Sequence, residues 1–155
     1  MKPLFAAIVS MLLLTGFSAQ SADHPNFVVI FTDDQGYGDL RCFGGKHVST
    51  PRIDRMAKEG MRFTDAHTTS AVCTPTRYGI LTGRYNWRSR LKRGVLFNAP
   101  DMALMDPKRL NLPNFLQNAG YHTGCVGKWH LGNDPLDHGF ATNIGGTAKG
   151  HPKSY

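Results

Sequence analysis

Internal repeats and low-complexity tracts are absent from this 155-residue sequence, and its histidines show no spacing that requires a metal site. Five of the seven histidines are scattered, at His47, His67, His122, His138 and His151. We therefore expect no zinc site, because zinc ligands recur at short, regular spacings. Without repeats, and with 41% hydrophobic residues, the sequence is typical of one modest globular domain.

Acidic residues are scarce: 11 Asp and Glu stand against 18 Lys and Arg, which gives a formal net charge of +7. A positive surface suits anionic substrates, and it could equally bind nucleic acid or a polyanionic glycan. Residues 84–93 contain five basic side chains, with Tyr85 and Trp87 between them. This run is interpreted as a binding patch or as a solvated loop, and we favour the loop. Nothing resembles a known nucleic-acid-binding module, so no nucleic-acid partner is expected.

A hydrophobic run long enough for a full membrane span is also missing, because the apolar stretch at residues 4–17 is too short. It follows a single Lys2 and precedes small residues, the order found in secretory signal peptides. We predict a signal at residues 1–22, cut between about Ala19 and Asp23; a membrane anchor is the less favoured alternative. The mature chain, residues 23–155, would be periplasmic or secreted, with no stable membrane anchor. It would carry 17 basic and 11 acidic residues, a net charge of +6.

Residues 73–84, CTPTRYGILTGR, carry the signals of a short helix. Pro75 suits the first turn, because its φ is already helical and it has no amide hydrogen to lose. Cys73 or Thr74 would be the N-cap, and Gly83 would end the helix. The residues expected to anchor the helix in the core are Ile80 and Leu81.

The same segment pairs a candidate nucleophile, Cys73, with a fixed cation, Arg77, one helical turn later. Cys73 would lie at the positive end of the helix, and both that end and Arg77 favour an anion. The alternative interpretation is a buried cysteine before an ordinary short helix.

These residues resemble the signature of the type I sulfatases, Cys-x-Pro-Ser-Arg followed after three residues by Leu-Thr-Gly-Arg. The matching positions are Cys73, Pro75, Arg77, Leu81, Thr82, Gly83 and Arg84. Thr76 departs from the pattern, because the family usually has serine there. The resemblance implies that a formylglycine-generating enzyme oxidises Cys73 to formylglycine, whose hydrate becomes the nucleophile and a metal ligand.

An acidic pair, Asp33 and Asp34, follows an apolar run at Phe27 to Phe31 that predicts a buried strand. Open α/β sheets bind ligands at the carboxyl ends of their strands. Two adjacent carboxylates repel unless a cation neutralises them, and hard oxygen ligands select Ca²⁺ or Mg²⁺. A solvated turn is the alternative. The sulfatase resemblance implies that this pair binds a divalent metal, usually calcium.

A third matching segment, GYHTGCVGKWHLG, spans Gly120 to Gly132. It predicts a strand at Tyr121 to Val126, followed by a turn that carries Lys128 and His130. A Lys-Trp-His triplet alone is usually ordinary surface sequence. Sulfatases carry Gly-Lys-Trp-His-Leu-Gly at this place, which implies that Lys128 and His130 contact the sulfate and the formylglycine hydrate.

Between these motifs, predicted helices alternate with predicted strands. Residues 50–60 predict a helix closed by a glycine, and Met61 to Ala66 alternates like a strand. Another helix begins near Pro113 and ends at Gly120. Its apolar face would be formed by Leu112, Phe115, Leu116 and Ala119. From Asn133 onward no strand is predicted. Such alternation predicts an α/β fold, a sheet flanked by helices.

The resemblance covers nearly the whole mature chain, but only the opening part of a sulfatase. It implies the N-terminal part of an alkaline-phosphatase-like catalytic domain, without the later Asp-Asn pair of the metal shell and the later His and Lys. We therefore expect half of a site, and no turnover by this chain alone.

In an exported chain, Cys42 and Cys125 could form a disulfide or remain small buried hydrophobic residues, which we favour.

The complete enzyme is expected to hydrolyse the sulfate ester of a small molecule or carbohydrate. The metal would polarise the sulfate, while Arg77 and Lys128 stabilise its charge and His130 orients the nucleophile. Two alternatives remain. One is hydrolysis of phosphate or phosphonate esters by the same geometry. The other is a secreted, non-catalytic module that binds polyanions through residues 84–93.

Overall fold

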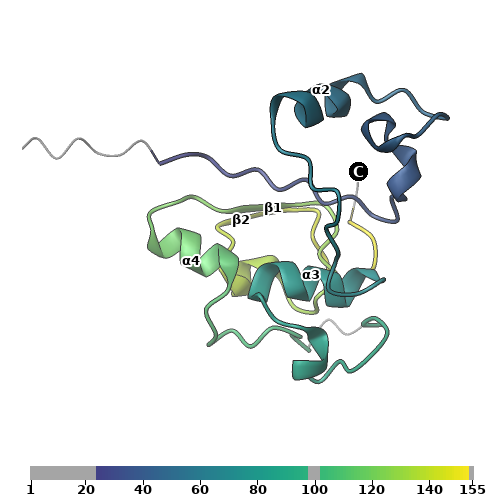
Figure 1. Ribbon diagram of the computed structural model, residues 1–155. Coiled ribbons are helices and arrows are strands. Elements are labelled where there is room, and N and C mark those ends of the chain that lie inside the picture. Colours follow the sequence, from purple (N-terminus) through teal and green to yellow (C-terminus); the bar gives the residue numbers. More distant parts are fainter. Residues whose placement is uncertain (1–23, 98–101, 154–155) are drawn as a thin grey trace, which may run out of the picture. The chain divides into compact units, whose positions relative to one another are not determined.

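The structure of the chain, a computed structural model, describes residues 24–97 and 102–153 (Figure 1). The chain divides into two units, residues 1–32 and residues 33–155. The predicted signal peptide lies outside the described residues. Within the described part of the chain, no helix has the length and apolar character needed to cross a membrane.

Residues 24–32, the described part of the first unit, run without helix or strand. The side chains from Phe27 to Phe31 are exposed. The prediction of a buried strand at Phe27 to Phe31 is therefore wrong in this structure. An apolar β-branched run becomes a strand only within a hydrogen-bonded ladder, and the sheet of the described residues consists of two other strands.

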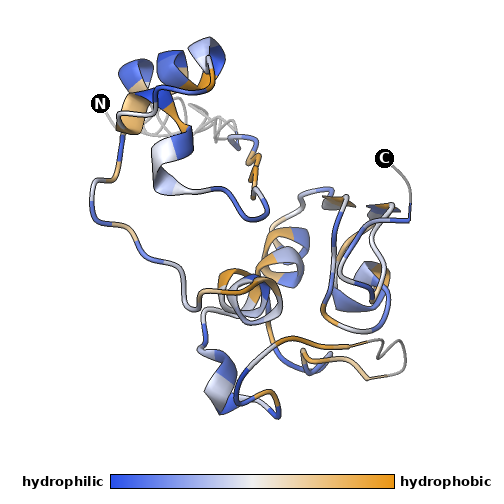
Figure 2. Ribbon diagram, turned by 90° about the vertical axis from the view of Figure 1, so that its right-hand side faces the viewer, coloured by the Kyte–Doolittle hydropathy of each residue, from blue (hydrophilic) through white to orange (hydrophobic). Residues whose placement is uncertain are grey.

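Two short 3-10 helices, η1 (Tyr37–Asp39) and η2 (Arg41–Phe43), precede helix α2 (Pro51–Glu59) in the second unit. Asp54 of α2 ties η2 to the helix, because its Oδ1 accepts a hydrogen bond from the Cys42 amide at 2.9 Å. Helix α2 has no buried residue, and Figure 2 shows it largely in hydrophilic colours. This helix is therefore held more by polar contacts than by a core.

The prediction of a helix at residues 50–60 is confirmed, since Pro51 is its first residue and Gly60 follows its last. The strand predicted at Met61 to Ala66 is wrong, because these residues are irregular and exposed. Alternation shows which side chains could share a face, but a strand also needs a neighbour to pair with.

Helix α3 (Cys73–Thr82) begins at the candidate nucleophile. Val72 is its N-cap, so the expectation that Cys73 or Thr74 caps the helix is wrong. Pro75 lies in the first turn, as predicted. Gly83 ends the helix with φ of 63°, a left-handed conformation that glycine adopts readily.

Tyr78 anchors α3 in the core, where only 5% of it is exposed. Leu81 packs against the same core, as predicted. Ile80 does not, because 39% of it is exposed. Residues three apart share a helix face, so Tyr78 and Leu81 turn inward together while Ile80 points elsewhere.

Helix α4 (Leu112–Asn118) packs against α3. Its N-cap is Asn111, whose side chain accepts a hydrogen bond from the amide of the third helical residue at 2.9 Å. Gly120 follows the helix with φ of 88°, so the predicted helix is confirmed. Its expected apolar face stays partly in solvent, since Leu112 is 38% and Phe115 57% exposed.

Strands β1 (Gly124–Val126) and β2 (Thr142–Ile144) form a two-stranded parallel sheet. Strand β1 is the second half of the strand predicted at Tyr121 to Val126. Strand β2 contradicts the expectation of no strand after Asn133. Three residues are too few to show an alternating pattern, and the pairing depends on tertiary structure. Helices combined with a parallel sheet confirm the α/β prediction.

The core is built around the segment that follows β1, which includes Trp129. Its buried members are Tyr78, Leu96, Leu104, Met105, Trp129 and Leu131. Trp129 donates a hydrogen bond from Nε1 to the Gly132 carbonyl at 2.7 Å, and its ring meets Phe140 edge-on at 5.9 Å between centroids. Because Trp129 lies between Lys128 and His130 in sequence, its burial fixes the segment that presents both.

All three cysteines are free thiols, so no disulfide joins Cys42 and Cys125 in this structure. Cys125 is partly buried and packs against the core. Burial raises the pKa of its thiol, the behaviour of a small hydrophobic residue.

His138 is a buried histidine whose ring has no hydrogen-bond partner among the described residues. It ends η4 (Pro135–His138), is 0% exposed, and lies against Trp129 at 5.7 Å between ring centroids. Burial lowers the pKa of His138, an effect that the neighbouring Asp137 carboxylate opposes.

We expect the free energy of unfolding to fall as the pH drops below about 6.5, the pKa of an unfolded histidine. In that range the unfolded chain takes up a proton that buried His138 does not, so protonation favours unfolding. His138→Phe should remove part of this pH dependence, whatever its effect on stability at neutral pH, and buried His130, whose pKa is also lowered, contributes in the same direction. Urea unfolding at about pH 7.5 and about pH 5.5, on either side of that pKa, measures it.

The matched control is His47→Gln, which changes an exposed histidine. It should leave the pH dependence as it is in the original protein. An unchanged slope in His138→Phe would show that another group governs acid unfolding.

Candidate active site

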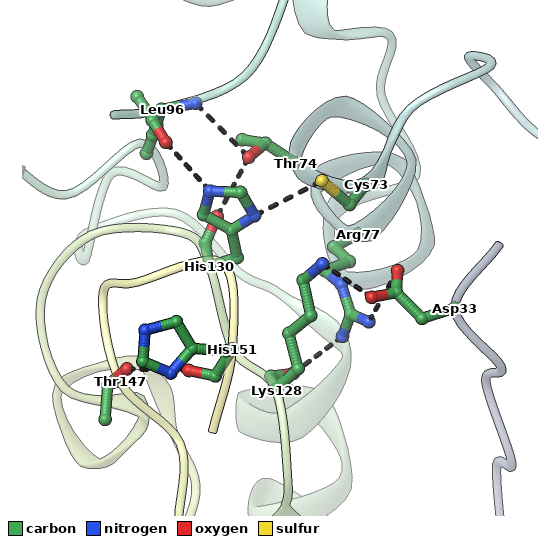
Figure 3. A network of polar contacts seen from close by, with 9 residues as sticks. All are labelled: Asp33, Cys73, Thr74, Arg77, Leu96, Lys128, His130, Thr147 and His151. Atoms are coloured by element: carbon green, nitrogen blue, oxygen red, sulfur yellow. Dashed lines mark hydrogen bonds and ion pairs between the residues drawn. The ribbon is translucent and has the colours of Figure 1, made fainter. Parts of the chain in front are cut away.

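Cys73 and His130 meet although 57 residues separate them in the sequence (Figure 3). Cys73 Sγ lies 3.2 Å from His130 Nδ1, and His130 Nε2 lies 2.8 Å from the carbonyl oxygen of Leu96. A carbonyl only accepts hydrogen bonds, so Nε2 carries the ring proton in the neutral imidazole. Nδ1 is then the acceptor, and the Cys73 thiol donates to it.

The backbone of His130 is held from several sides. Its amide donates to the Thr147 carbonyl at 3.0 Å, and its carbonyl accepts from the Thr74 hydroxyl at 3.2 Å. That hydroxyl also accepts from the Leu96 amide at 3.3 Å. These contacts stabilise a φ of 59° at His130, in the left-handed region that a residue with a side chain rarely adopts.

Burial lowers the pKa of His130, and the cations of Lys128 and Arg77 act in the same direction. The bond to the Leu96 carbonyl and the charge of Asp33 oppose this shift. The net result favours a neutral ring with a free lone pair at Nδ1. His130 can therefore accept a proton from a group at residue 73.

Asp33, Arg77 and Lys128 form a cluster of charges next to this pair. Lys128 Nζ lies 2.7 Å from Asp33 Oδ2, and Arg77 Nη2 lies 3.9 Å from Asp33 Oδ1. Arg77 Nη1 also donates to the Lys128 carbonyl at 2.6 Å. The two cationic side chains are only 12% and 14% exposed, so solvent screens them weakly. Burial lowers the pKa of Arg77, and Asp33 partly offsets this.

The structure thus brings together five of the six residues selected from the sequence: Asp33, Cys73, Arg77, Lys128 and His130. Asp34 is exposed, with φ of 52°, and has no hydrogen bond or ion pair to the rest of the described chain. Within residues 24–97 and 102–153, no three His, Cys, Asp or Glu side chains converge as a metal site would require.

Two participants in the site were not predicted from the sequence. Thr74, which is 0% exposed, connects His130 to Leu96 through its hydroxyl. Its position beside Cys73 could have indicated this role, because a buried threonine in the first turn of a helix needs a hydrogen-bond partner for its hydroxyl. The Leu96 carbonyl gave no signal, since every residue carries that group.

The sulfatase family model matches residues 25–152. The chain belongs to the sulfatase family. The predicted resemblance is therefore confirmed. This sulfatase chain is 46% identical over 118 residues to an N-acetylgalactosamine-6-O-sulfatase of Bacteroides thetaiotaomicron, covering 76% of the chain and 23% of that protein. It is 41% identical over 126 residues to arylsulfatase A of Homo sapiens, covering 81% of the chain and 25% of that protein.

Solved structures are similar as well. One, from work on glycosaminoglycan metabolism by Bacteroides thetaiotaomicron, has a TM-score of 0.71 and 41% identity, over 77% of this chain and 27% of that chain. Another, described as a complex with its substrate D-glucosamine-2-N,6-O-disulfate, has a TM-score of 0.63 and 34% identity, over 76% and 22%. The sulfatase chain thus spans about a quarter of the length of its relatives.

Proposed function

We propose that the protein hydrolyses sulfate esters at residue 73. The placement of Cys73 at 3.2 Å from the acceptor nitrogen of His130, on the helix that also carries Arg77, supports this proposal (Figure 3). A nucleophile needs a group that takes its proton and cations that bind the anion it attacks. Both kinds of group surround residue 73.

Residue 73 is proposed to be formylglycine in the active protein, made from Cys73 by a formylglycine-generating enzyme. Formylglycine supplies a hydrated aldehyde as the nucleophile, with two hydroxyls where cysteine has one thiol. Residue 73 is partly buried at the first position of α3, so the positive end of the helix faces the charge that develops there.

His130 is proposed to hold and move the proton of the nucleophile. Its Nδ1 accepts from Sγ of Cys73 in the structure, and a hydroxyl at residue 73 can donate to the same atom. The bond from Nε2 to Leu96 fixes the ring, so that Nδ1 stays directed at residue 73. A ring kept neutral by burial is ready to accept.

Arg77 and Lys128 are proposed to bind the sulfate and to stabilise charge during its transfer. Both are held in place, Arg77 by the Lys128 carbonyl and Lys128 by Asp33. Fixed, weakly screened cations stabilise a transition state strongly, because they need no reorganisation when charge develops.

Calcium, or magnesium, is proposed to be held by Asp33, Asp34 and residue 73. The two carboxylates offer hard oxygen donors, and Asp33 already lies against a positive charge, at 2.7 Å from Lys128 Nζ. The three groups are not gathered as a metal site among the described residues, but their oxygen donors are of the kind that a hard divalent cation takes, and they supply part of the roughly six to eight oxygens that calcium binds. A bound cation would polarise the sulfate oxygens.

The proposed substrate is a sulfated carbohydrate, because similar proteins include an N-acetylgalactosamine-6-O-sulfatase and a complex with D-glucosamine-2-N,6-O-disulfate. A sulfated small molecule is the alternative within the same chemistry.

We also propose export to the periplasm or the outside of the cell, on the basis of the apolar run at residues 4–17.

Mass spectrometry of the Cys73 peptide, from protein made in its own host, tests the proposal. We expect formylglycine there, which is lighter than cysteine, and unmodified thiols in the control peptides that contain Cys42 and Cys125. An intact thiol at residue 73 would count against the sulfatase mechanism. Faster turnover of an aryl phosphate than of an aryl sulfate would instead favour phosphate ester hydrolysis.

A further inference from the structure

A cavity of about 520 Å³ lies beside the basic run and is lined by several arginines. The charged residues that line it are Arg84, Arg88, Arg90, Arg109 and Asp106. Four positive charges minus one negative charge leave the lining with a net charge of +3. So strong an excess of guanidinium groups favours an anionic ligand, because Arg binds carboxylate and sulfate oxygens through paired hydrogen bonds.

Two of these arginines are already engaged. Arg90 donates to the Met102 carbonyl at 2.7 Å, and Arg109 Nε lies 3.5 Å from Asp106 Oδ2. By contrast, the guanidinium groups of Arg84 and Arg88 have no partner within the described part of the chain. The cavity therefore presents two cations whose hydrogen-bonding capacity is available to a ligand.

The cavity is separate from the Cys73 site. Thr82 and Tyr78 of α3 line it. Thr82 follows Cys73 by nine residues, which at about 100° per residue places it on the opposite side of the helix. Tyr78 follows Cys73 by five residues and is turned by about 140°. The two sites thus use opposite faces of α3, and the cavity is not part of the sulfate ester site.

A pair of exposed aromatic rings lies in the same segment. Tyr85 and Trp87 stack with 4.0 Å between ring centroids and 10° between ring planes. They remain 47% and 50% exposed. In sequence both rings lie between the cavity residues Arg84 and Arg88. Exposed Tyr and Trp side chains with a rigid geometry are typical of binding surfaces, because they offer large contact area at little entropic cost.

We propose that this cavity and the neighbouring ring stack form an accessory binding site for an acidic carbohydrate. The guanidinium groups of Arg84 and Arg88 bind its sulfate or carboxylate groups, and the exposed face of Trp87 packs against a sugar ring. The choice of a carbohydrate over another polyanion rests on the proposed function, whereas the anion site rests on the cavity itself. The site holds a glycan chain on the protein independently of the chemistry at residue 73.

Calorimetric titration of the full chain carrying Cys73→Ala tests this inference, because binding is then measured without turnover. The probes are a sulfated chondroitin tetrasaccharide, inorganic sulfate alone and a single-stranded oligothymidylate. Arg84→Gln/Arg88→Gln should weaken tetrasaccharide binding by at least about tenfold, the effect of losing hydrogen bonds to charged groups. Trp87→Ala should weaken tetrasaccharide binding but not sulfate binding.

The matched control is Arg52→Gln/Arg93→Gln, which removes the same charge from two exposed arginines outside the cavity lining. It should change affinity by less than about threefold. Circular dichroism confirms that each variant folds. Equal losses in both double variants would overturn the inference in favour of diffuse attraction. Tighter binding of oligothymidylate than of tetrasaccharide would overturn the choice of carbohydrate. Absence of tetrasaccharide binding, in a case where the protein with unsubstituted Cys73 hydrolyses a sulfate ester, would overturn the accessory site alone.

Discussion

Cys73→Ala is expected to lower kcat for sulfate ester hydrolysis by at least about 10⁴-fold, because loss of a nucleophile leaves only binding and electrostatic stabilisation. The helix itself should persist, since Val72 and Gly83 set its ends and Tyr78 anchors it. The measurement is steady-state hydrolysis of an aryl sulfate by the original protein and by the variant. KM should change far less than kcat, because the variant keeps Arg77 and Lys128, the proposed sulfate-binding cations.

The Cys73→Ser variant tests separately whether the second hydroxyl of the nucleophile is needed to release sulfate. A serine can attack sulfur once, but its sulfate ester has no second hydroxyl to expel the sulfate. We therefore expect at most a single turnover, with a sulfo group left on the protein and visible by mass spectrometry. Cys42→Ala is the matched control, a free thiol outside the site cluster, and should keep near-normal activity. Multiple turnovers by the alanine variant would refute a nucleophile at residue 73.

Trp129→Ala is expected to lower the free energy of unfolding by about 3–5 kcal/mol, the usual cost of deleting a buried aromatic side chain. Trp129 is 2% exposed and meets both Phe140 and His138 through its ring. The loss also leaves the Gly132 carbonyl without its indole donor. Such a cost is a large share of the total stability of a small domain.

Urea unfolding of the full chain measures this effect. Trp129→Phe should cost less than Trp129→Ala, because it keeps most of the apolar surface and loses the Nε1 hydrogen bond. Trp87→Ala, at a half-exposed tryptophan that stacks on Tyr85, should cost only about 1.5 kcal/mol or less. A small loss in Trp129→Ala, equal to that in Trp87→Ala, would mean that the core does not depend on this ring.

The helices were predictable because their ends carry local signals. Pro51 and Gly60 bound α2, and Pro75 and Gly83 mark the first turn and the end of α3. The strands were not predictable in the same way, because strand pairing depends on two segments that lie far apart in the sequence. Phe27 to Phe31 has the composition of a strand and forms none here, whereas Thr142 to Ile144 has no evident pattern and pairs with β1.

The candidate site was predictable to the extent that its side chains lie in motifs. Cys73 and Arg77 are close in sequence, and the family resemblance linked them to Lys128 and His130. The contact between Cys73 and His130 spans 57 residues, so spacing alone could not reveal it. The Leu96 carbonyl selects the ring tautomer of His130. Its role could not be predicted from the sequence, because every residue carries the same backbone carbonyl.

The backbone at His130 has a consequence for anyone who redesigns this chain for stability. A glycine would adopt φ of 59° without the steric cost, about 1 kcal/mol or more, that a side chain incurs there. Glycine at position 130 would also delete a buried side chain and its hydrogen bonds to Cys73 and Leu96, a loss that outweighs the strain it relieves. The strained backbone and the imidazole that faces Cys73 are therefore retained together, and the contacts of the side chain offset the cost of the backbone conformation.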